Sequence, residues 1–292
     1  MRSWLFAPGD SEKKCQKAIG SEADIALLDL EDSVMPQNKA AARQQVAAAL
    51  SAASDTQRVW VRINPLSTAD AIADLAAIMP GEPGGVFVPK AEGAADITML
   101  HDYLTALEAA NGLPQKSTRI AALVTETAAA MYRTGEYAGD YRGKERLAAM
   151  SWGAEDLSSE LGAREQRGSD GEYAATYELA RSLCLIGAVA AGATPIETVQ
   201  PEFRDLETLE RRARAVRASG FRGMLAIHPA QVDPINTAFT ATQEELDRAR
   251  AIVRAFEDNP GAGTVALDGQ MLDRPHLSLA RRMLAENEDQ GR

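Results

Sequence analysis

The sequence predicts an α/β protein that folds as a closed (β/α)8 barrel, a TIM barrel, with a C-terminal helical extension. Three observations carry this prediction. Eight short apolar runs recur along the chain, helical stretches separate them, and the runs do not alternate between apolar and polar residues. Continuous apolar runs are typical of parallel strands covered on both faces. Eight strand–helix repeats in 292 residues fit one barrel.

The eight predicted strands are rich in Val, Ile, Leu and Ala. They occupy residues 4–8, 24–30, 59–64, 85–90, 119–125, 146–152, 194–199 and 223–229. Ala-rich amphipathic stretches lie between them, and residues 94–111 are the clearest predicted helix because Gly112 follows as a stop signal. An open doubly wound sheet is the competing fold. Neither the glycine-rich dinucleotide motif nor the P-loop motif follows any of these runs.

The rest of the chain departs from this repeat in two places. Residues 157–172 are polar and Gly-rich, which predicts an enlarged loop. A helix is expected over 243–257, and the tail from Gly261 onward predicts a loop, a short turn containing Asp273 and a last helix. The predicted domains are therefore a barrel over residues 1–258 and a C-terminal extension over residues 259–292.

Composition limits the classes of partner. A formal net charge of -11 argues against a general nucleic-acid surface. The basic cluster in the sequence recurs at helical spacing and is interpreted as a solvated helix face; it comprises Arg211, Arg212, Arg214 and Arg217. The two cysteines, Cys15 and Cys184, have no metal-ligand spacing. The sequence shows no signal-peptide pattern and no apolar segment long enough to span a membrane. We therefore expect a cytoplasmic protein with no membrane contact.

Polar residues follow the predicted strands at the points where they end. The second strand ends in three carboxylates within four positions, and the others contribute one or two polar groups each. These residues are Asp29, Glu31, Asp32, Arg62, Asn64, Lys90, Thr125, Glu126, Glu155, Asp156 and His228. In a barrel the carboxyl ends of all strands meet on one face, and that face carries the active site. We therefore expect these residues to converge.

Carboxylates without His or Cys partners suit a hard cation such as Mg²⁺, which takes one or two protein carboxylates together with substrate oxygens and water. A guanidinium beside such a metal can grip a carboxylate or stabilise an enolate oxygen. The predicted chemistry is Lewis-acid activation of a small oxyacid.

Structural roles are the alternative for each of these residues. Glu126 and Asp156 can belong to the first turns of helices, the former capped by Thr125. Asp29 and Asp32 can pair with Lys39 or Arg43. Lys90 can be a solvated loop residue, and His228 can fix a loop before Pro229. Arg62 is harder to dismiss, because a buried arginine needs an anion. The three tryptophans are expected to pack in the barrel; they are Trp4, Trp60 and Trp152.

Eight short motifs occur in the same order as in a known family. They are RSWLFAPG (2–9), DLEDSV (29–34), VRINP (61–65), VPKAE (88–92), ETAAA (126–130), WGAEDLSSELG (152–162), GFRGMLAIHPAQV (220–232) and DGQMLDRP (268–275). With these motifs the chain resembles the citrate lyase β-subunit-like family, in the malyl-CoA and citramalyl-CoA lyase group of the HpcH/HpaI aldolase superfamily. The resemblance runs from Arg2 to about Leu284. The sequence departs from it at residues 239–242, FTAT, where the family usually has Phe-Thr-Pro-Ser.

The resemblance implies a role for individual residues. Glu126 and Asp156 match the family's Mg²⁺ ligands, and Glu126 also lies beside the substrate. Arg62 matches its substrate-binding catalytic arginine.

Further roles follow from the same resemblance. Glu31 and Asp32 match catalytic-site carboxylates that orient metal-bound water. Asp273 matches an aspartate that acts as acid or base, reaching in from a neighbouring subunit of a trimer. Arg2 and Lys17 match basic positions near the phosphates of coenzyme A.

The resemblance implies a Mg²⁺-dependent carbon–carbon lyase for a 3-hydroxy-3-carboxyacyl thioester of the malyl-, citramalyl- or citryl-CoA type. The products would be an acyl thioester and a 2-oxoacid, and the reverse condensation uses the same site. Two alternatives stay open. The chain can be the β-subunit of a citrate lyase that acts on a carrier-protein thioester with α- and γ-subunits, or an aldolase for a free hydroxy-oxoacid. A homotrimer or hexamer is the expected assembly.

Overall fold

The structure is a computed structural model that describes residues 1–169 and 171–290. The chain divides into two compact units between Asn236 and Thr237. The first unit holds eight strands: β1 (Ser3–Pro8), β2 (Ile25–Asp29), β3 (Val59–Arg62), β4 (Gly85–Val88), β5 (Arg119–Leu123), β6 (Leu147–Ser151), β7 (Thr194–Glu197) and β8 (Gly223–Ala226). Each of the eight predicted apolar runs overlaps one of them, and only β1 extends beyond its run, by one residue at Ser3.

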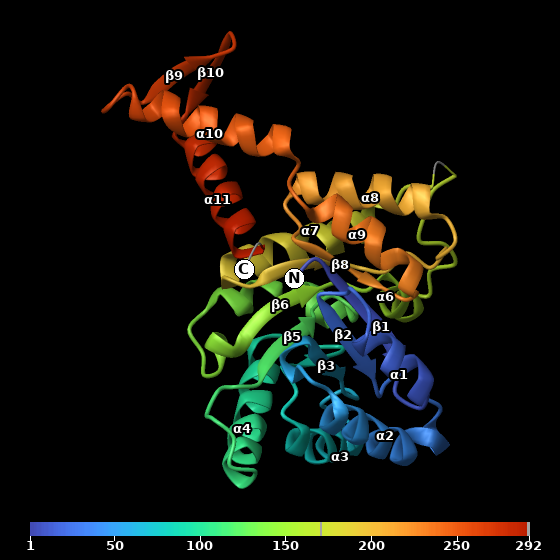
Figure 1. The fold of residues 1–292 in the computed structure, drawn as a ribbon. Coiled ribbons are helices and arrows are strands. Elements are labelled where there is room, and N and C mark those ends of the chain that lie inside the picture. Colours follow the sequence, from blue (N-terminus) through green and yellow to red (C-terminus); the bar gives the residue numbers. More distant parts are fainter. Residues whose placement is uncertain (170, 291–292) are drawn as a thin grey trace. The chain divides into compact units, whose positions relative to one another are not determined.

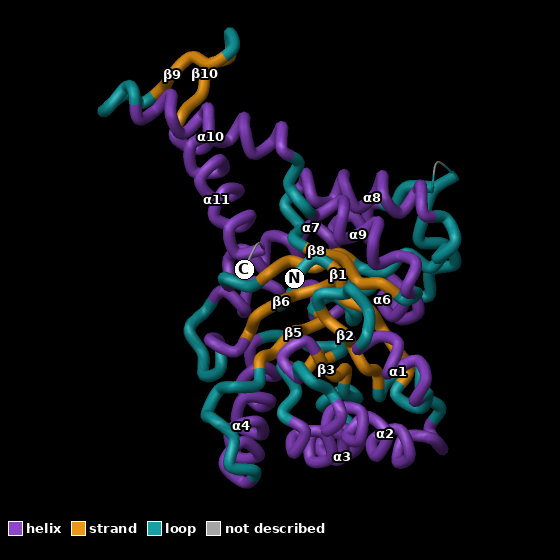
Figure 2. The backbone as a smooth tube through the Cα atoms, in the orientation of Figure 1, coloured by secondary structure: helices purple, strands orange, loops and turns teal. Residues whose placement is uncertain are grey.

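The eight strands form a closed barrel in chain order, and each neighbouring pair is parallel. The helices of the first unit lie outside the strands (Figure 1 and Figure 2). They are α1 (Glu12–Ile19), α2 (Lys39–Ala52), α3 (Ala69–Ile78), α4 (Ala94–Ala110), α5 (Ala128–Met131), α6 (Ala154–Leu161), α7 (Ala175–Ala191) and α8 (Leu206–Ser219). Helix α9 (Val232–Phe239) contains the division between the units. The predicted TIM barrel is confirmed.

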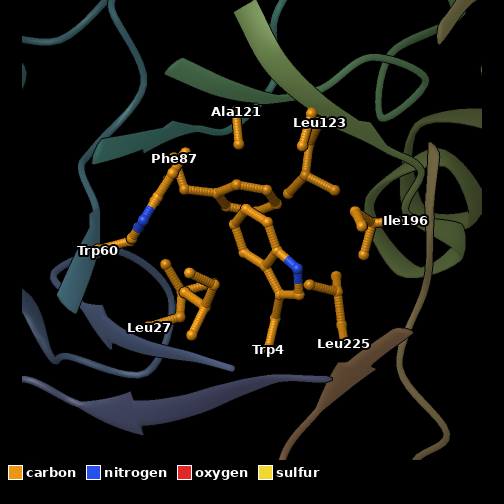
Figure 3. Packing of buried hydrophobic residues seen from close by; sticks show 10 residues of the cluster. Trp4, Leu27, Trp60, Phe87, Ala121, Leu123, Ile196 and Leu225 are labelled. Carbon is orange, nitrogen blue, oxygen red and sulfur yellow. The ribbon is translucent and has the colours of Figure 1, made fainter. Parts of the chain in front are cut away.

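Aromatic side chains fill the interior of the barrel. Trp4 and Trp60 meet edge to face with ring centroids 4.9 Å apart, and Phe87 lies 6.1 Å from Trp4 (Figure 3). Gly85 stands beside Trp60 in the register of β3 and β4, and a Cβ there would come within 2.4 Å of the indole. The barrel interior is therefore a packed core, with its cavity closed by side chains.

A buried ion pair fixes α4 to the barrel. Arg146 binds Glu108 with two hydrogen bonds of 2.7 Å, and both side chains are fully buried. Glu108 also accepts hydrogen bonds from the backbone N–H groups of Lys116 and Thr118. The pair therefore joins the C-terminal half of α4 to the segments that lead into β5 and β6.

The second unit is built from α10 (Gln243–Glu257), the strands β9 (Thr264–Leu267) and β10 (Gln270–Asp273), and α11 (Arg274–Gln290). The two strands form an antiparallel hairpin whose turn is Asp268–Gly269, and both turn residues have positive φ. The unit has its own apolar cluster: Ala249, Ile252, Phe256, Val265, Leu272, Leu277 and Ala280. The expected helix over 243–257 is confirmed, while a hairpin stands where a loop and a short turn were expected.

Two further expectations have a structural outcome. Residues 157–161 continue helix α6, so the enlarged loop begins only at Gly162. Among the helices in the described part of the chain, none is both long enough and apolar enough to span a membrane. The sequence-based division at residue 258 stays a prediction.

Candidate active site

The carboxyl ends of β2 and β3 deliver a carboxylate and a guanidinium side by side. Asp29 and Arg62 are register partners in these adjacent strands. Leu27 and Trp60, two residues earlier, belong to the cluster inside the barrel. Because side chains alternate along a strand, Asp29 and Arg62 also face inward, above the aromatic core.

Arg62 is held by two acidic residues. Its Nε and Nη2 each donate to one carboxylate oxygen of Asp29 at 2.7 Å, and its Nη1 lies 3.0 Å from Oε2 of Glu31. The guanidinium also lies over the ring of Phe6, 4.7 Å from the centroid. Burial would lower the pKa of Arg62, but the charges of Asp29, Glu31 and Glu126 raise it far above its ordinary value. Arg62 therefore stays charged at every relevant pH.

The carboxylate of Asp29 also organises the loop that follows β2. It accepts hydrogen bonds from the backbone N–H of Glu31 at 2.9 Å and of Ser33 at 3.1 Å. Burial would raise the pKa of Asp29, but the charge and hydrogen bonds of Arg62 outweigh it and hold the pKa below its usual range. Asp29 thus orients Arg62 and Glu31 together.

The side chain of Lys39 holds the backbone of the same loop after β2. Its Nζ donates to the carbonyl oxygens of Leu30 and Glu31 at 2.9 and 3.0 Å, and to Oδ1 of Asn64 at 2.6 Å. Asp29 is therefore not the partner of Lys39, and Arg43 pairs instead with Asp70 and Asp74. The structural alternative for Asp29 is wrong in its choice of partners.

Lys90 lies at the centre of the carboxylate cluster. Its Nζ is 2.7 Å from Oε1 of Glu31, 3.2 Å from Oδ1 of Asp156 and 3.7 Å from Oδ2 of Asp32. Its backbone N–H donates to Oε2 of Glu126 at 2.7 Å. Lys90 also has the left-handed φ of 50°, which is rare for a residue with a side chain. It is therefore not a freely solvated loop residue.

Glu126 and Asp156 approach each other from two neighbouring strands. Glu126 follows β5 and is buried, and Thr127, not Thr125, caps the short helix α5. Asp156 lies in the first turn of α6, as the structural alternative expected, and its side chain reaches Lys90. Gly153 leaves room for the side chain of Glu126, because a Cβ there would come within 2.8 Å of Glu126 Oε1.

The electrostatics of Glu126 and Asp156 favour binding of a cation. Burial raises the pKa of Glu126 to about 8, and the negative charges of Asp156 and Glu31 add to the effect. Burial likewise raises the pKa of Glu31, although Arg62 and Lys90 oppose it. Clustered carboxylates that resist ionisation together are stabilised when a divalent cation lies between them.

The residues present fit Mg²⁺. Within residues 1–169 and 171–290, no group of three or more His, Cys, Asp or Glu side chains is arranged to hold a metal ion. Glu126 and Asp156 would thus supply two oxygen ligands, and the remaining positions would be left to water and substrate. This sparse protein coordination is the kind that Mg²⁺ accepts.

Other predicted site residues lie elsewhere. Arg2 precedes β1, at the opposite end of the barrel from Arg62, and its Nη2 pairs with Asp24 at 2.8 Å. Lys17 is exposed on α1. His228 caps the short turn that begins at Pro229, so its loop-fixing interpretation is confirmed.

Asp273 ends β10 in the second unit. Its Oδ1 lies 2.6 Å from Nδ1 of His276, and both side chains are about half exposed.

Trp152 and the loop after α6 border the segment that carries Asp156. Tyr173 meets Trp152 edge to face at 5.0 Å, and its hydroxyl accepts a hydrogen bond from Arg212 at 3.3 Å. Arg212 also pairs with the buried Glu197 at 2.7 Å, so it does not belong to a solvated helix face. Trp4 and Trp60 do pack inside the barrel, as expected.

The contacts of Lys39, Asn64 and Phe6 were not foreseen from the sequence. Lys39 and Asn64 act on backbone carbonyls of another loop, and no local motif signals such a contact. Phe6 is the second aromatic residue of β1, on the same face as Trp4, so strand alternation is the signal for its inward position.

The chain is similar to a set of known proteins over nearly its whole length. The family model described as HpcH/HpaI aldolase/citrate lyase matches residues 2–229. The citrate lyase subunit beta-like protein of Mycobacterium tuberculosis is 35% identical over 96% of this chain and 93% of its own length. A (3S)-malyl-CoA thioesterase of Cereibacter sphaeroides is 33% identical over 98% of this chain and 94% of its own length. The citrate lyase subunit beta of Escherichia coli K12 is 32% identical over 99% of this chain and 94% of its own length.

A solved structure extends this likeness to three dimensions. CitE from Mycobacterium tuberculosis, in complex with magnesium, acetoacetate and coenzyme A, superimposes with a TM-score of 0.79. It is 34% identical and the match covers 98% of both chains.

Proposed function

The chain belongs to the HpcH/HpaI aldolase/citrate lyase family, and from that premise we propose that it is a Mg²⁺-dependent carbon–carbon lyase. Its substrate is a 3-hydroxy-3-carboxyacyl thioester of the malyl-, citramalyl- or citryl-CoA type. The products are an acyl thioester and a 2-oxoacid, and the same site catalyses the reverse condensation.

One observation carries this proposal. Glu126 and Asp156, whose mutual repulsion calls for a cation, lie at the same end of the barrel as an arginine fixed from two sides. The charge of Glu126 is among those that raise the pKa of Arg62, which supports a metal site near the guanidinium. A metal-bound oxyacid and a neighbouring enolate oxygen need such an arrangement.

Each residue then has a chemical task. When bound, Mg²⁺ supplies Lewis-acid polarisation of the hydroxyl and carboxylate oxygens of the substrate. Glu126 and Asp156 hold it. Arg62 binds the thioester oxygen, and its charge stabilises that oxygen as it becomes negative. Asp29 and Glu31 keep the guanidinium in one orientation, so little reorganisation is needed during the reaction.

The reaction balances as a retro-Claisen cleavage. A base in the site takes the hydroxyl proton as a carbonyl forms at C3, and the electron pair of the breaking C2–C3 bond passes to the thioester as an enolate. The 2-oxoacid leaves, and the enolate carbon takes up a proton to give the acyl thioester. We assign that proton to Asp273, delivered from a neighbouring subunit of a homotrimer or hexamer. Asp32 and Glu31 would orient water at the metal. Arg2 and Lys17 are the proposed contacts of the coenzyme A phosphates, although Arg2 lies at the opposite end of the barrel from Arg62 and pairs with Asp24.

The test is release of 2-oxoacid from malyl-CoA, citramalyl-CoA and citryl-CoA, each assayed with Mg²⁺ and with EDTA. We expect glyoxylate, pyruvate or oxaloacetate from one of them only when Mg²⁺ is present. Free thiol is measured in parallel, because one relative is named a thioesterase and hydrolysis would release coenzyme A. Thiol release without 2-oxoacid would replace the lyase with a hydrolase at the same site.

A second candidate follows from the likeness to the citrate lyase subunit beta of E. coli. In that case the substrate is a thioester on a carrier protein, and the chain works with α- and γ-subunits. Activity with a citryl carrier-protein thioester, together with none on the three CoA esters, would establish this alternative. An aldolase for a free hydroxy-oxoacid would instead cleave its substrate without any thioester. The protein is expected to act in the cytoplasm in all three cases.

A further inference from the structure

Lys90 is the one residue in the described site that touches both proposed metal ligands. Its backbone N–H binds Glu126, and its side-chain ammonium lies 3.2 Å from Asp156. The ammonium is also hydrogen-bonded to Glu31, which in turn contacts Arg62. Lys90 therefore joins the metal-ligand pair to the arginine that is proposed to bind substrate.

The backbone of Lys90 is bent in a way that brings both of its groups into the site. A residue with a Cβ adopts a left-handed φ only at an energetic cost, and Lys90 has φ 50°. The strain is offset by contacts to three carboxylates, at Glu31, Glu126 and Asp156. Strained residues of this kind concentrate at functional sites.

The contact with Asp156 conflicts with metal binding. Oδ1 of Asp156 now faces the ammonium, and Asp156 is 31% exposed, so its carboxylate can turn toward a cation. An ammonium ion a few ångströms from a divalent cation repels it strongly in a partly buried site. The two positive charges cannot share Asp156 without cost.

We propose that the ammonium of Lys90 is an internal counter-ion that competes with Mg²⁺ for Asp156 and thereby lowers the affinity of the site for the metal. The inference rests on the proposed function, because it takes Glu126 and Asp156 as the metal ligands. Metal binding turns Asp156 away from Lys90, which stays with Glu31 and Asp32 beside the bound substrate. Lys90 is thus a positioning residue that sets the metal affinity of the site.

The experiment is a calorimetric titration of the EDTA-stripped full-length protein with MgCl₂ in the absence of substrate. We expect K90M to bind Mg²⁺ about tenfold more tightly than the wild type, because one nearby positive charge is gone and Lys90 is only 28% exposed to screening solvent. K90Q is measured in parallel, since it keeps a hydrogen-bond donor for Glu31 and lacks only the charge. If K90M does not fold, the Mg²⁺ affinity of K90Q tests the proposal instead.

Lys116 provides a matched control. It is also a lysine with left-handed φ, 67°, and it also forms a 2.7 Å ion pair, with Glu145, but on the exposed surface. K116M changes the net charge and the backbone preference in the same way, and its Mg²⁺ affinity should equal that of the wild type. Equal or weaker binding in folded K90M or K90Q would overturn the proposal.

A melting series gives a readout that does not depend on turnover. In EDTA, K90M should melt below the wild type, because the carboxylates have lost a counter-ion. Saturating Mg²⁺ should raise the melting temperature of K90M by more than it raises that of the wild type, in line with tighter binding. D156N separates the two hypotheses. If D156N loses Mg²⁺ binding while K90M binds Mg²⁺ like the wild type, only the proposed role of Lys90 is refuted. If D156N binds Mg²⁺ like the wild type, the assignment of Asp156 as a metal ligand is refuted.

Discussion

Arg62 and Lys90 are the two cations that hold the carboxylates of the barrel mouth together. Arg62 takes Asp29 and one oxygen of Glu31, and Lys90 takes the other oxygen of Glu31. Glu31 is therefore shared, and its Oε2 meets the guanidinium without the geometry of a hydrogen bond. This leaves Glu126 and Asp156 as the under-neutralised pair, which is why the divalent cation is assigned to them.

For turnover, the planar geometry of the Arg62 guanidinium is expected to contribute more than its positive charge. In R62K the single ammonium cannot hold both oxygens of Asp29 and also face the substrate. We expect turnover to fall about a hundredfold to a thousandfold, as when a donor to a developing oxyanion is removed. Steady-state assays of 2-oxoacid release measure this. R119K is the control, because Arg119 also stacks on an aromatic ring but is the first residue of β5, at the other end of the barrel. Equal losses in both variants would point to a general effect on folding.

Removal of Glu126 should separate metal binding from stability. E126Q keeps the size of the side chain and deletes a buried acid that burial and Asp156 disfavour in its charged form. We expect Mg²⁺ binding and turnover to be lost, while the melting temperature in EDTA does not fall. Calorimetry and thermal melts check both points. E155Q changes the exposed neighbour of Asp156 and should behave like the wild type. Retained Mg²⁺ binding in E126Q would contradict the ligand assignment.

The residues that sequence reasoning identified best are those with an unusual position. Arg62 stood out because it ends an apolar strand, and Asp29, Glu31 and Asp32 because three carboxylates crowd one strand end. The arrangement among them was not predictable. The pairing of Asp29 with Arg62 depends on the register of β2 and β3, and the contacts of Lys90 depend on a left-handed backbone that the sequence Pro-Lys does not announce.

At the scale of elements, parallel strands place functional groups at one end of the barrel and structural anchors at the other. The pair of Glu108 and Arg146 is such an anchor, because it ties α4 to the starts of β5 and β6. Neither side chain has contact with solvent, and each is fully hydrogen-bonded. Breaking a buried pair of this kind leaves an unpaired charge in the interior.

We expect E108Q to lower the free energy of unfolding by about 3–5 kcal/mol at pH 7. Burial alone would raise the pKa of Glu108, but Arg146 and two backbone N–H groups hold it below its ordinary value of 4.5. A lowered pKa stabilises the fold above that ordinary value, and the stabilisation is lost as the pH falls through the lowered pKa. The gap between wild type and variant should therefore narrow below about pH 4.5.

Urea denaturation at pH 7 and at pH 3.5 measures this gap. E145Q is the comparison, because it breaks the exposed pair of Glu145 and Lys116 and should cost less than about 1 kcal/mol. A gap that stays constant across the two pH values would show that the charge of Glu108 is not the source of its contribution.

The elements of the first unit were predictable because apolar runs and amphipathic stretches alternate so regularly. The hairpin of the second unit was not foreseen, although Asp268–Gly269 is a strong turn signal. Its two strands have only four residues each and expose half of their side chains, so they form no apolar run like those that marked the barrel strands. Short, exposed strands are the elements that periodicity identifies least well.

For the whole molecule, the proposed role of Asp273 assigns a residue of the second unit to chemistry at a barrel. Asp273 ends β10 and contacts His276 at the start of α11, and both are exposed within their unit. We assign Asp273 to the site of another subunit of a closed oligomer. In such an assembly each active site is made from two chains.

A mixing experiment tests that assignment. E126Q and D273N should each be inactive alone. After mixing in equal amounts and subunit exchange, a site that combines an intact Glu126 with an intact Asp273 forms by chance in roughly a quarter of cases. We expect activity to recover to about that fraction of the wild type, with the oligomer confirmed by size-exclusion chromatography. No recovery in a mixed oligomer would place Asp273 in the site of its own chain.

The three tryptophans report by fluorescence on two different places in the fold. Trp4 and Trp60 lie in the barrel interior, where their emission depends on the strands being closed around them. Trp152 lies outside that cluster, against Tyr173, and directly precedes the segment that carries Asp156. The contact between Trp152 and Tyr173 makes its emission sensitive to the position of this segment. The chain thus carries its own spectroscopic probe of the mouth of the barrel, alongside an independent probe of the folded state.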